Sequence, residues 1–516
     1  MQDSNNNLEK TNYIEATPLE LLVYVAKYLD HKTITSNLHV SKRVIAIYNE
    51  WLKNGKIEFN QKTDINSFND YIKNNEIEPK HISFKQIKNQ PVQLAHLKSL
   101  KSLKLIHTNY ESPQFAELVN LTSLMIDSEN ISIDNLEKLT TLKVLELTGK
   151  FSRELRFESF KEFPDLEELT INIKNIYSFF LATRFTLNQL PNPFKLRKLQ
   201  LSNVIIEEKA SVTLNLFNNL KDLHFSNVEI RELSFENLSN LKTLTLHKCK
   251  FSNWQALGSC INLKKLVLDG TKLNDISQLP VMNKVKELHL IDNEITSNLQ
   301  LLAKKFPNLT TLSLQGVGYG IVKYPLLSRN ASFTAGIGKT RISNFYKLPT
   351  FSSVKNLILF NHNMNDENDT KETLETKFPN LTSLNYEVTS SVKQLKAIEG
   401  LSKLEFLVLD LSNVTFLSKQ NESLLKLDNL KEIKVILSKH SKDIKMPARE
   451  LESLGVILAM LKIKNVIIDL SEVKSGKYKE LLEKIIDEKV EELKPQENKG
   501  FRSGIEKEEK QTCLIL

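Results

Sequence analysis

Residues 241–268 read LKTLTLHKCKFSNWQALGSCINLKKLVL and contain two copies of one pattern. The pattern is L-x-x-L-x-L, and its last leucine is Leu246 in the first copy and Leu268 in the second, 22 residues later. The alternation of apolar and polar residues predicts a short β-strand with one buried face. Because a single strand of this kind cannot bury its own face, the spacing predicts that successive copies stack on one another.

The pattern recurs along most of the chain, and its middle leucines mostly lie about 21 to 24 residues apart. Degenerate copies extend it to Pro79-Ile82-Phe84 at one end and to Ile463-Val466-Ile468 at the other. Two copies carry a further signature residue, which is Asn293 in LHLIDNEI and Cys249 in LTLHKCKF. Over this length, the pattern resembles the leucine-rich-repeat family.

The resemblance implies an α/β fold, a leucine-rich-repeat solenoid over residues 75–470 with a parallel concave sheet. The helix-like stretches 296–305 and 391–400 are expected to cover its convex side. One long gap between copies is glycine-rich, and it predicts an irregular insertion at about residues 315–353.

The concave sheet is the expected binding face for a target protein, because residues between the leucines point outward. Its histidines are spaced by whole repeats and are too far apart for a shared metal. The chain shows no catalytic motif. Gly338-Lys339-Thr340 resembles the end of a P-loop, but Phe333 occupies the position where that motif requires a glycine. We therefore expect a binding protein without cofactor or metal. The residues expected to contact the target are Lys198, Gln200, Asp222, His224, Thr245, His247, Lys265, Asp269, Glu287, His289 and Gln315.

The composition favours a protein that faces the cytosol. The net charge is +8, but Lys and Glu are interleaved, so no nucleic-acid-binding stripe is expected. Three cysteines cannot build a disulfide framework, and no apolar run is long enough to span a membrane. The polar start of the sequence does not resemble a secretory signal, so sequons such as Asn120, Asn308, Asn380 and Asn413 are expected to be unused.

Residues 1–15 are predicted to be disordered, and residues 16–60 are predicted to form a small helical domain. Thr17 can cap a helix that starts at Pro18, and Glu20 completes a capping box. Apolar residues then recur at helical spacing in two successive helices, which together expose more apolar surface than so short a unit can bury.

This segment resembles an F-box, whose pattern is L-P-x-E-L-L-x-x-I-x-x-Y-L with a downstream V-C-R. It departs from that pattern at Ser41, where the family has Cys, and at Val44, which replaces the usual Trp. The matching residues are Pro18, Glu20, Leu21, Leu22, Val25, Tyr28, Leu29, Ile34, Val40 and Lys42.

The F-box resemblance implies two partners, the adaptor subunit and the cullin of an SCF-type (cullin-RING) ubiquitin ligase. Contact with the adaptor would be apolar helix packing. The alternative is that these helices only cap the first repeat. The residues expected to bind the adaptor are Pro18, Leu21, Leu22, Leu29, Ile34 and Val40.

The sequence of the C-terminal part predicts an amphipathic capping helix over residues 475–493 and a flexible tail over residues 494–516. The tail ends in Cys513-Leu514-Ile515-Leu516, which has the C-a-a-X pattern with Leu at X. This pattern predicts geranylgeranylation of Cys513 by protein geranylgeranyltransferase, and so a lipid anchor on the cytoplasmic face of a membrane. One prenyl chain needs a second signal for stable anchoring.

Together these features resemble membrane-anchored F-box/leucine-rich-repeat substrate receptors of SCF ubiquitin ligases. Such a receptor is a non-catalytic subunit that holds a target near the recruited enzyme. The chain is either eukaryotic or a bacterial effector that would act at a host-cell membrane. The alternative function is a prenylated leucine-rich-repeat scaffold or bacterial effector with no ligase role.

Overall fold

The computed structural model divides into two compact units, with the boundary between Thr310 and Thr311, and each is considered by itself. It describes residues 42–493 except 61–64, 89–91, 93, 95, 109, 111, 132–134, 152–161, 175–183, 186–191, 207–215, 229–234, 236–237, 250–252, 294, 296, 316–347, 361–372, 389–391, 413–417 and 438–447.

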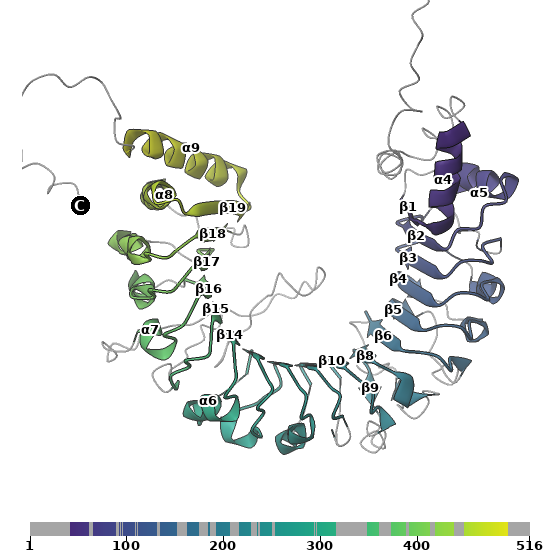
Figure 1. Ribbon diagram of the computed structural model, residues 1–516, viewed down its shortest axis with the longest axis horizontal. Helices are drawn as coiled ribbons and strands as arrows, with labels where there is room; N and C mark the ends of the chain where they lie inside the picture. The colour runs from purple at the N-terminus through teal and green to yellow at the C-terminus, as the bar shows by residue number, and fades with distance from the viewer. Residues whose placement is uncertain are drawn as a thin grey trace, which may run out of the picture. The chain divides into compact units, whose positions relative to one another are not determined.

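Unit 1 contains a parallel β-sheet in which strands follow one another in chain order (Figure 1). A separate pair is formed by β7 (Arg184–Phe185) and β9 (Ile205–Ile206). The strands of the sheet are β1 (Lys56–Phe59), β2 (His81–Lys85), β3 (Ser102–Ile106), β4 (Ser123–Ile131), β5 (Val144–Phe151), β6 (Glu168–Ile173), β8 (Lys198–Ser202), β10 (Asp222–Ser226), β11 (Thr243–His247), β12 (Lys265–Asp269) and β13 (Glu287–Ile291).

The repeated leucines form the core of this unit. Leu244 lies opposite Leu266, and Leu266 lies opposite Leu288, and all three are fully buried. The solenoid predicted from the repeat is therefore confirmed. Short helical turns lie between strands, including the 3-10 helix η10 (Trp254–Ser259) and α6 (Leu302–Lys305). In the described part of this unit, the other short 3-10 helices are η2 (Ser112–Glu117), η3 (Leu136–Lys138), η7 (Pro193–Lys195), η11 (Ile276–Gln278) and η12 (Leu299–Leu301).

The sheet begins earlier in the chain than the sequence predicts. β1 pairs with β2 in register, so that Ile57 lies opposite Ile82 and Phe59 opposite Phe84. All four side chains are buried. The described sheet therefore starts at Lys56, within the predicted helical domain of residues 16–60 and upstream of the predicted solenoid start at residue 75.

Two helices, α4 (Lys42–Asn54) and α5 (Ile65–Asn74), lie beside the first strands (Figure 1). Tyr48 and Leu52 of α4 are buried. The hydroxyl of Tyr71 on α5 donates to Asn49 Oδ1 at 2.8 Å, and the ring of Phe68 meets Phe59 of β1 edge-on at 4.5 Å. α4 is thus fixed to the start of the sheet through α5.

Polar side chains satisfy backbone groups inside the turns that leave the strands. Asn293 is fully buried, and its Nδ2 donates to the carbonyls of Leu268 and Ile291 at 2.7 and 2.9 Å. Its Oδ1 accepts from the backbone and the hydroxyl of Thr271. Cys249 is buried in the same part of an earlier repeat and donates to carbonyls there. The signature residues noted in the sequence therefore join neighbouring repeats.

The N-L-T sequons have a structural role. Asn120 Nδ2 donates to the carbonyl of Lys98 at 3.0 Å, and Thr122 Oγ1 donates to that of Lys101 at 3.0 Å. In both pairs the acceptor belongs to the preceding repeat. Asn308 with Thr310, and Asn380 with Thr382, make the equivalent bonds. These residues recur because they bond one repeat to the next.

Unit 2 continues the repeat pattern in a second run of parallel strands. Its last strand differs from the predicted register, because Ile433 lies opposite Ile468, not Val466. A regular helix, α8 (Ala448–Ile463), precedes this strand, and Asn465 turns the chain with a φ of 66°. The strands are β14 (Thr311–Gln315), β15 (Asn356–Phe360), β16 (Ser383–Glu387), β17 (Phe406–Asp410), β18 (Glu432–Leu437) and β19 (Ile467–Val473). The short helices between them are α7 (Leu374–Lys377), η14 (Val392–Ile398) and η15 (Ser418–Lys426).

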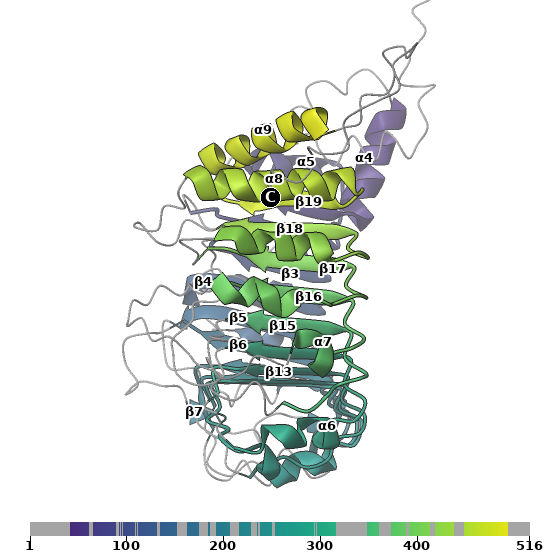
Figure 2. The ribbon, with the colours of Figure 1, turned by 90° about the vertical axis from the view of Figure 1, so that its left-hand side faces the viewer.

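The helix α9 (Gly476–Leu493) lies against α8 (Figure 2). Its apolar side is buried at Leu482 and Ile486. A Cβ on Gly455 of α8 would come within 2.6 Å of Ile485, so only glycine permits this approach. None of the described helices is both long and apolar enough to cross a membrane.

We expect Asn293→Ala to lower the free energy of unfolding by roughly 3 kcal/mol, because it leaves buried backbone groups unpaired. The exposed Asn283→Ala is the matched control and should change it by less than about 0.5 kcal/mol. Urea unfolding followed by circular dichroism measures both. Equal midpoints for the two variants would contradict the bonding assigned to Asn293.

Candidate protein-binding face

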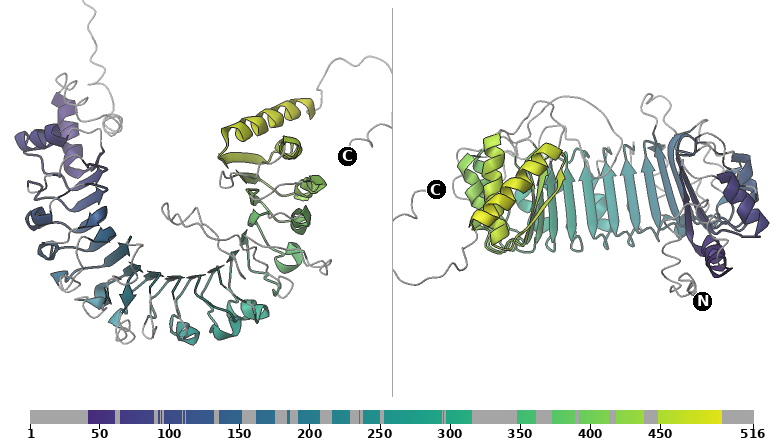
Figure 3. Two further views of the ribbon diagram at one scale, coloured as in Figure 1. Left: turned by 180° about the vertical axis from the view of Figure 1, so that it is seen from behind. Right: turned by 90° about the horizontal axis from the view of Figure 1, so that it is seen from above.

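The solvent side of β8 and β10–β13 forms a face that we call the unit 1 face. The strands run parallel and in register, so their outward residues form rows across the sheet (Figure 3). It carries the predicted target-binding residues of unit 1, which are Lys198, Gln200, Asp222, His224, Thr245, His247, Lys265, Asp269, Glu287 and His289.

The first residues of successive strands form a row, and this row ends in a charged cluster. Lys265 Nζ lies 2.6 Å from Glu287 Oε1, and His289 Nε2 lies 2.6 Å from the same oxygen. Burial favours a raised pKa at Glu287, but hydrogen bonds from Lys265 and His289 outweigh it and lower that pKa. Burial lowers the pKa of His289 despite its carboxylate neighbour. At neutral pH the cluster thus presents Lys265 and Glu287 as a charged pair.

A second cluster lies along the row of last strand residues. Ser226 Oγ lies 3.0 Å from His247 Nδ1, and His247 Nε2 lies 3.6 Å from Asp269 Oδ2. Burial lowers the pKa of His247 to about 4, and burial together with Asp292 raises the pKa of Asp269 to about 7. Both groups are therefore shifted towards their neutral forms.

This serine, histidine and aspartate do not have the properties of a hydrolytic triad. A catalytic histidine needs a pKa near the working pH and an ionised carboxylate to orient it, and both are opposed here by burial. The backbone amides of these strands pair with neighbouring strands and so are not free to stabilise an oxyanion. The row can instead exchange hydrogen bonds with a bound partner.

The histidines do not form a metal site. His224 and His289 lie on β10 and β13, with β11 and β12 between them. Across the described parts of the chain, no group of three or more His, Cys, Asp or Glu side chains could hold a metal ion. Burial and the nearby Lys198 lower the pKa of His224, so it is a neutral hydrogen-bonding group at pH 7.

One predicted target-binding residue does not lie on this face. Gln315 belongs to β14 of unit 2 and is buried, with 7% of its surface exposed. Its Nε2 donates to Ser313 Oγ at 2.6 Å. The alternation of apolar and polar residues therefore does not make this position exposed.

Several predicted features lie outside the described residues. They are the predicted disordered residues 1–15, the adaptor-binding residues Pro18, Leu21, Leu22, Leu29, Ile34 and Val40, most of the predicted insertion at 315–353 with Gly338-Lys339-Thr340, and the tail with Cys513.

No family model matches the chain. Among solved structures, it is similar to a leucine-rich-repeat protein of Leptospira interrogans, at 19% identity over 83% of this chain and 92% of the other, with a TM-score of 0.44. It is also similar to the functional domain of InlJ from Listeria monocytogenes, at 18% identity over 66% of this chain and 64% of the other, with a TM-score of 0.39.

A third similar structure is the leucine-rich-repeat ectodomain of a membrane receptor kinase from Arabidopsis thaliana. Its identity is 14% over 80% of this chain and 50% of the other, and its TM-score is 0.37. The first and the third of these structures are described as leucine-rich-repeat proteins.

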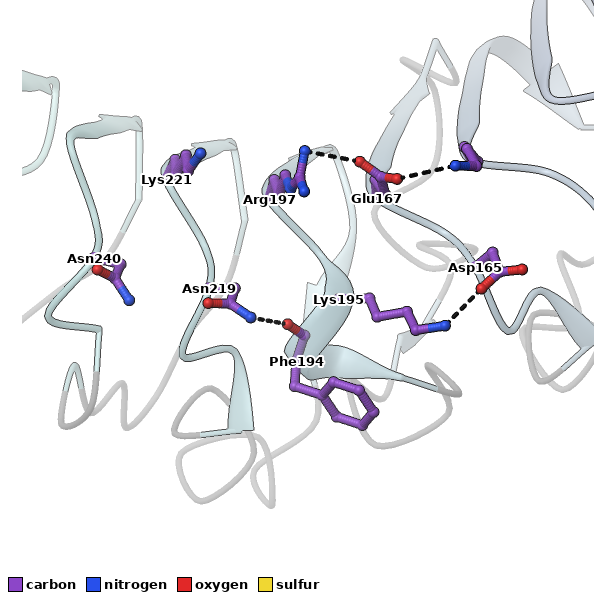
Figure 4. Close-up of a pocket in the computed structure, with 9 residues that line it drawn as sticks. Asp165, Glu167, Phe194, Lys195, Arg197, Asn219, Lys221 and Asn240 are labelled. Carbon is purple, nitrogen blue, oxygen red and sulfur yellow. Dashed lines mark hydrogen bonds and ion pairs between the residues drawn. The ribbon is translucent and has the colours of Figure 1, made fainter.

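The sequence did not predict a cavity at the edge of unit 1 where the strands begin. This cavity has a volume of about 500 Å³ and is lined by polar side chains and by Phe194 (Figure 4). Glu167 pairs with Arg197 at 3.1 Å and with Lys143 at 3.5 Å, and Lys195 pairs with Asp165 at 2.5 Å. Comparing the residue that follows the first leucine of every repeat would have revealed the cations at this edge.

The Asp269 carboxyl predicts a defined pH dependence. The folded chain holds its proton more tightly than the unfolded chain, so the free energy of unfolding falls as pH rises from 3.8 towards about 7. Asp269→Asn removes this loss and should stabilise the protein at pH 8 by up to about 4 kcal/mol, with the gain vanishing below pH 4.

Urea midpoints measured from pH 4 to 8 test this dependence, with the exposed Asp222→Asn on β10, two strands away, as the control. If Asp269→Asn is no more stable than the wild type at pH 8, the assigned protonation of Asp269 is wrong.

Proposed function

We propose that the protein is the substrate-recognition subunit of an SCF-type (cullin-RING) ubiquitin ligase. In this role the F-box-like segment binds the ligase adaptor, and the unit 1 face binds a target protein. The observation that carries the proposal is the combination of an F-box-like segment with a leucine-rich-repeat face in one chain. The protein itself performs no covalent chemistry; it raises the local concentration of target at the recruited enzyme.

The unit 1 face suits a protein partner. It combines a charged pair at Lys265 and Glu287 with neutral hydrogen-bonding groups at His224 and His247. Such a mixture of partly buried polar groups gives specificity, because a mismatched partner leaves some of them unpaired.

The packing of α4 supports a coupling between the two functions. A ligase receptor must hold its target at a defined place relative to the adaptor. The α4 helix begins at Lys42, the last of the F-box-like residues, and its Tyr48 and Leu52 are buried beside the first strands. The backbone of Lys80 in the adjoining turn donates to the carbonyl of Lys53 at 3.2 Å. Movement of the adaptor-binding segment would thus be transmitted to the sheet.

The second candidate is a leucine-rich-repeat scaffold or bacterial effector with no ligase role. The buried side of α4 favours it, since a helix that only shields the first repeat needs the same contacts. The two candidates differ at Leu21 and Leu22. A cap would need them for folding, whereas an F-box needs them for the adaptor.

We predict that Leu21→Asp combined with Leu22→Asp abolishes co-purification with the adaptor when the two proteins are co-expressed, because charges would enter an apolar helix interface. The thermal midpoint of the repeat array should stay within a few degrees of the wild type. The control is Ile467→Asp, which places a single aspartate on a side chain that is 63% exposed in unit 2. Retained adaptor binding, or unfolding of the double variant, would refute the ligase assignment.

We further propose that Cys513 carries a geranylgeranyl group that attaches the protein to the cytoplasmic face of a membrane. Protein geranylgeranyltransferase would be the modifying enzyme. Cys249 and Cys260 are buried, and burial raises the pKa of the Cys249 thiol to about 11, so neither is suited to modification.

Cys513→Ser should move the protein from the membrane fraction to the soluble fraction of a eukaryotic cell. Leu516→Ser should retain a lipid but change it to farnesyl, which mass spectrometry of the C-terminal peptide distinguishes. An unmodified Cys513 in the wild-type protein would exclude the lipid anchor.

A further inference from the structure

A row of cations follows the edge of unit 1 at which the strands begin. Each cation is the residue after the first apolar residue of its repeat, one position before the strand. Backbone hydrogen bonds place the row in register, since the amide of each member donates to the carbonyl of the preceding one at 2.7 or 2.8 Å. We call this row the basic edge. Its members are Arg197, Lys221, Lys242, Lys264 and Lys286.

The basic edge is exposed and largely unneutralised. All five side chains are exposed, and adjacent members are one strand spacing apart, about 4.8 Å. Arg197 pairs with Glu167 (Figure 4). Within the described residues, the lysines at 221, 242, 264 and 286 have no acidic partner within 4.0 Å. The nearby carboxylate of Glu287 is already bound to Lys265 and His289.

The turns that carry the basic edge contain no acidic residue. From 192 to 197, 216 to 221, 238 to 242, 259 to 264 and 280 to 286, the sequence has neither Asp nor Glu. The equivalent position in unit 2 is different, because Glu405 and Lys431 occupy adjacent turns and pair at 2.9 Å. The row of like charge is therefore a property of these five repeats and not of the repeat as such.

Apolar side chains protrude from the same turns. Ile261 is 61% exposed, Leu216 is 54%, Val281 is 51% and Phe194 is 49%. Each stands two to four residues before the first apolar residue of its repeat. A small cavity of about 180 Å³ lies between Ile261 and Val281. Exposed apolar side chains in this number, beside a row of cations, indicate an interaction surface.

We propose that the basic edge, with its protruding apolar side chains, binds the surface of an anionic lipid bilayer. Anionic headgroups attract lysines held close to the membrane, and each adds about fivefold to the partition. Phe194, Ile261 and their neighbours would enter the boundary between headgroups and acyl chains. The strands start along one edge (Figure 3), so successive turns can meet the membrane together.

A single-stranded nucleic acid fits these observations less well. Nonspecific binding of such strands uses a basic groove with aromatic side chains on which bases stack. The exposed apolar residues here are aliphatic except for Phe194, and phosphate recognition gives them no role. The row is also mainly lysine, which lacks the bidentate geometry that arginine offers to a phosphate.

This surface acts independently of the proposed lipid on Cys513. Where that lipid is present, the basic edge supplies the second signal that a single prenyl chain requires. The test therefore uses the full-length chain made in bacteria, which carries no prenyl group. A negative result would refute membrane binding by the basic edge without affecting the ligase proposal. Failure of the ligase proposal would likewise leave membrane binding by the basic edge untouched.

The experiment is co-sedimentation with vesicles of phosphatidylcholine, with and without phosphatidylserine. The wild type should bind only the vesicles that contain phosphatidylserine, and less at high salt. A variant with Lys221, Lys242, Lys264 and Lys286 all changed to Glu should bind at least about a hundredfold more weakly. Phe194→Ser with Ile261→Ser should weaken binding about tenfold without changing its salt dependence.

The matched control carries the same charge change on exposed lysines of unit 1 away from the edge. It should bind as the wild type does, and circular dichroism should give the same thermal midpoint for every variant. Absence of vesicle binding, or equal loss in both four-Glu variants, would overturn the proposal. So would tighter binding to a labelled single-stranded oligonucleotide than to the vesicles. The control positions are Lys104, Lys150, Lys272 and Lys304.

Discussion

The hydrogen bonds between neighbouring repeats are the interaction on which each unit depends. At the start of β11, the amides of Lys242 and Thr243 both donate to the carbonyl of Lys221, at 2.7 and 3.0 Å. The same arrangement recurs from repeat to repeat, and the leucines behind it are buried only because a neighbour covers them. A repeat by itself would leave both its backbone groups and its leucines exposed to water.

This stacking explains why side chains far apart in sequence form continuous surfaces. A residue at a fixed place in the repeat returns at each strand, so five such positions create the basic edge. The same rule builds the row in which Ser226, His247 and Asp269 face one another across three strands. Function in such a fold lies in rows of side chains and not in one loop or pocket.

The sequence predicts the leucine core well because strand burial follows a strict alternation. The pattern does not predict β1, where Ile57 and Phe59 replace leucine. It also predicts the register of β19 two residues too early, because the regular helix α8 precedes that strand. The sequence pattern predicts Gln315 at the surface, but this side chain is buried and donates a hydrogen bond to Ser313. The basic edge escapes notice because its members are about one repeat apart and look like scattered lysines.

The function proposed for the repeat array is to hold a target protein for a ubiquitin ligase. Affinity purification of the tagged full-length chain from eukaryotic cytosol, followed by quantitative mass spectrometry, tests it most directly. The account predicts that peptides of the adaptor subunit and of a cullin are enriched together. Enrichment of other proteins with neither adaptor nor cullin would contradict it and leave the scaffold as the function.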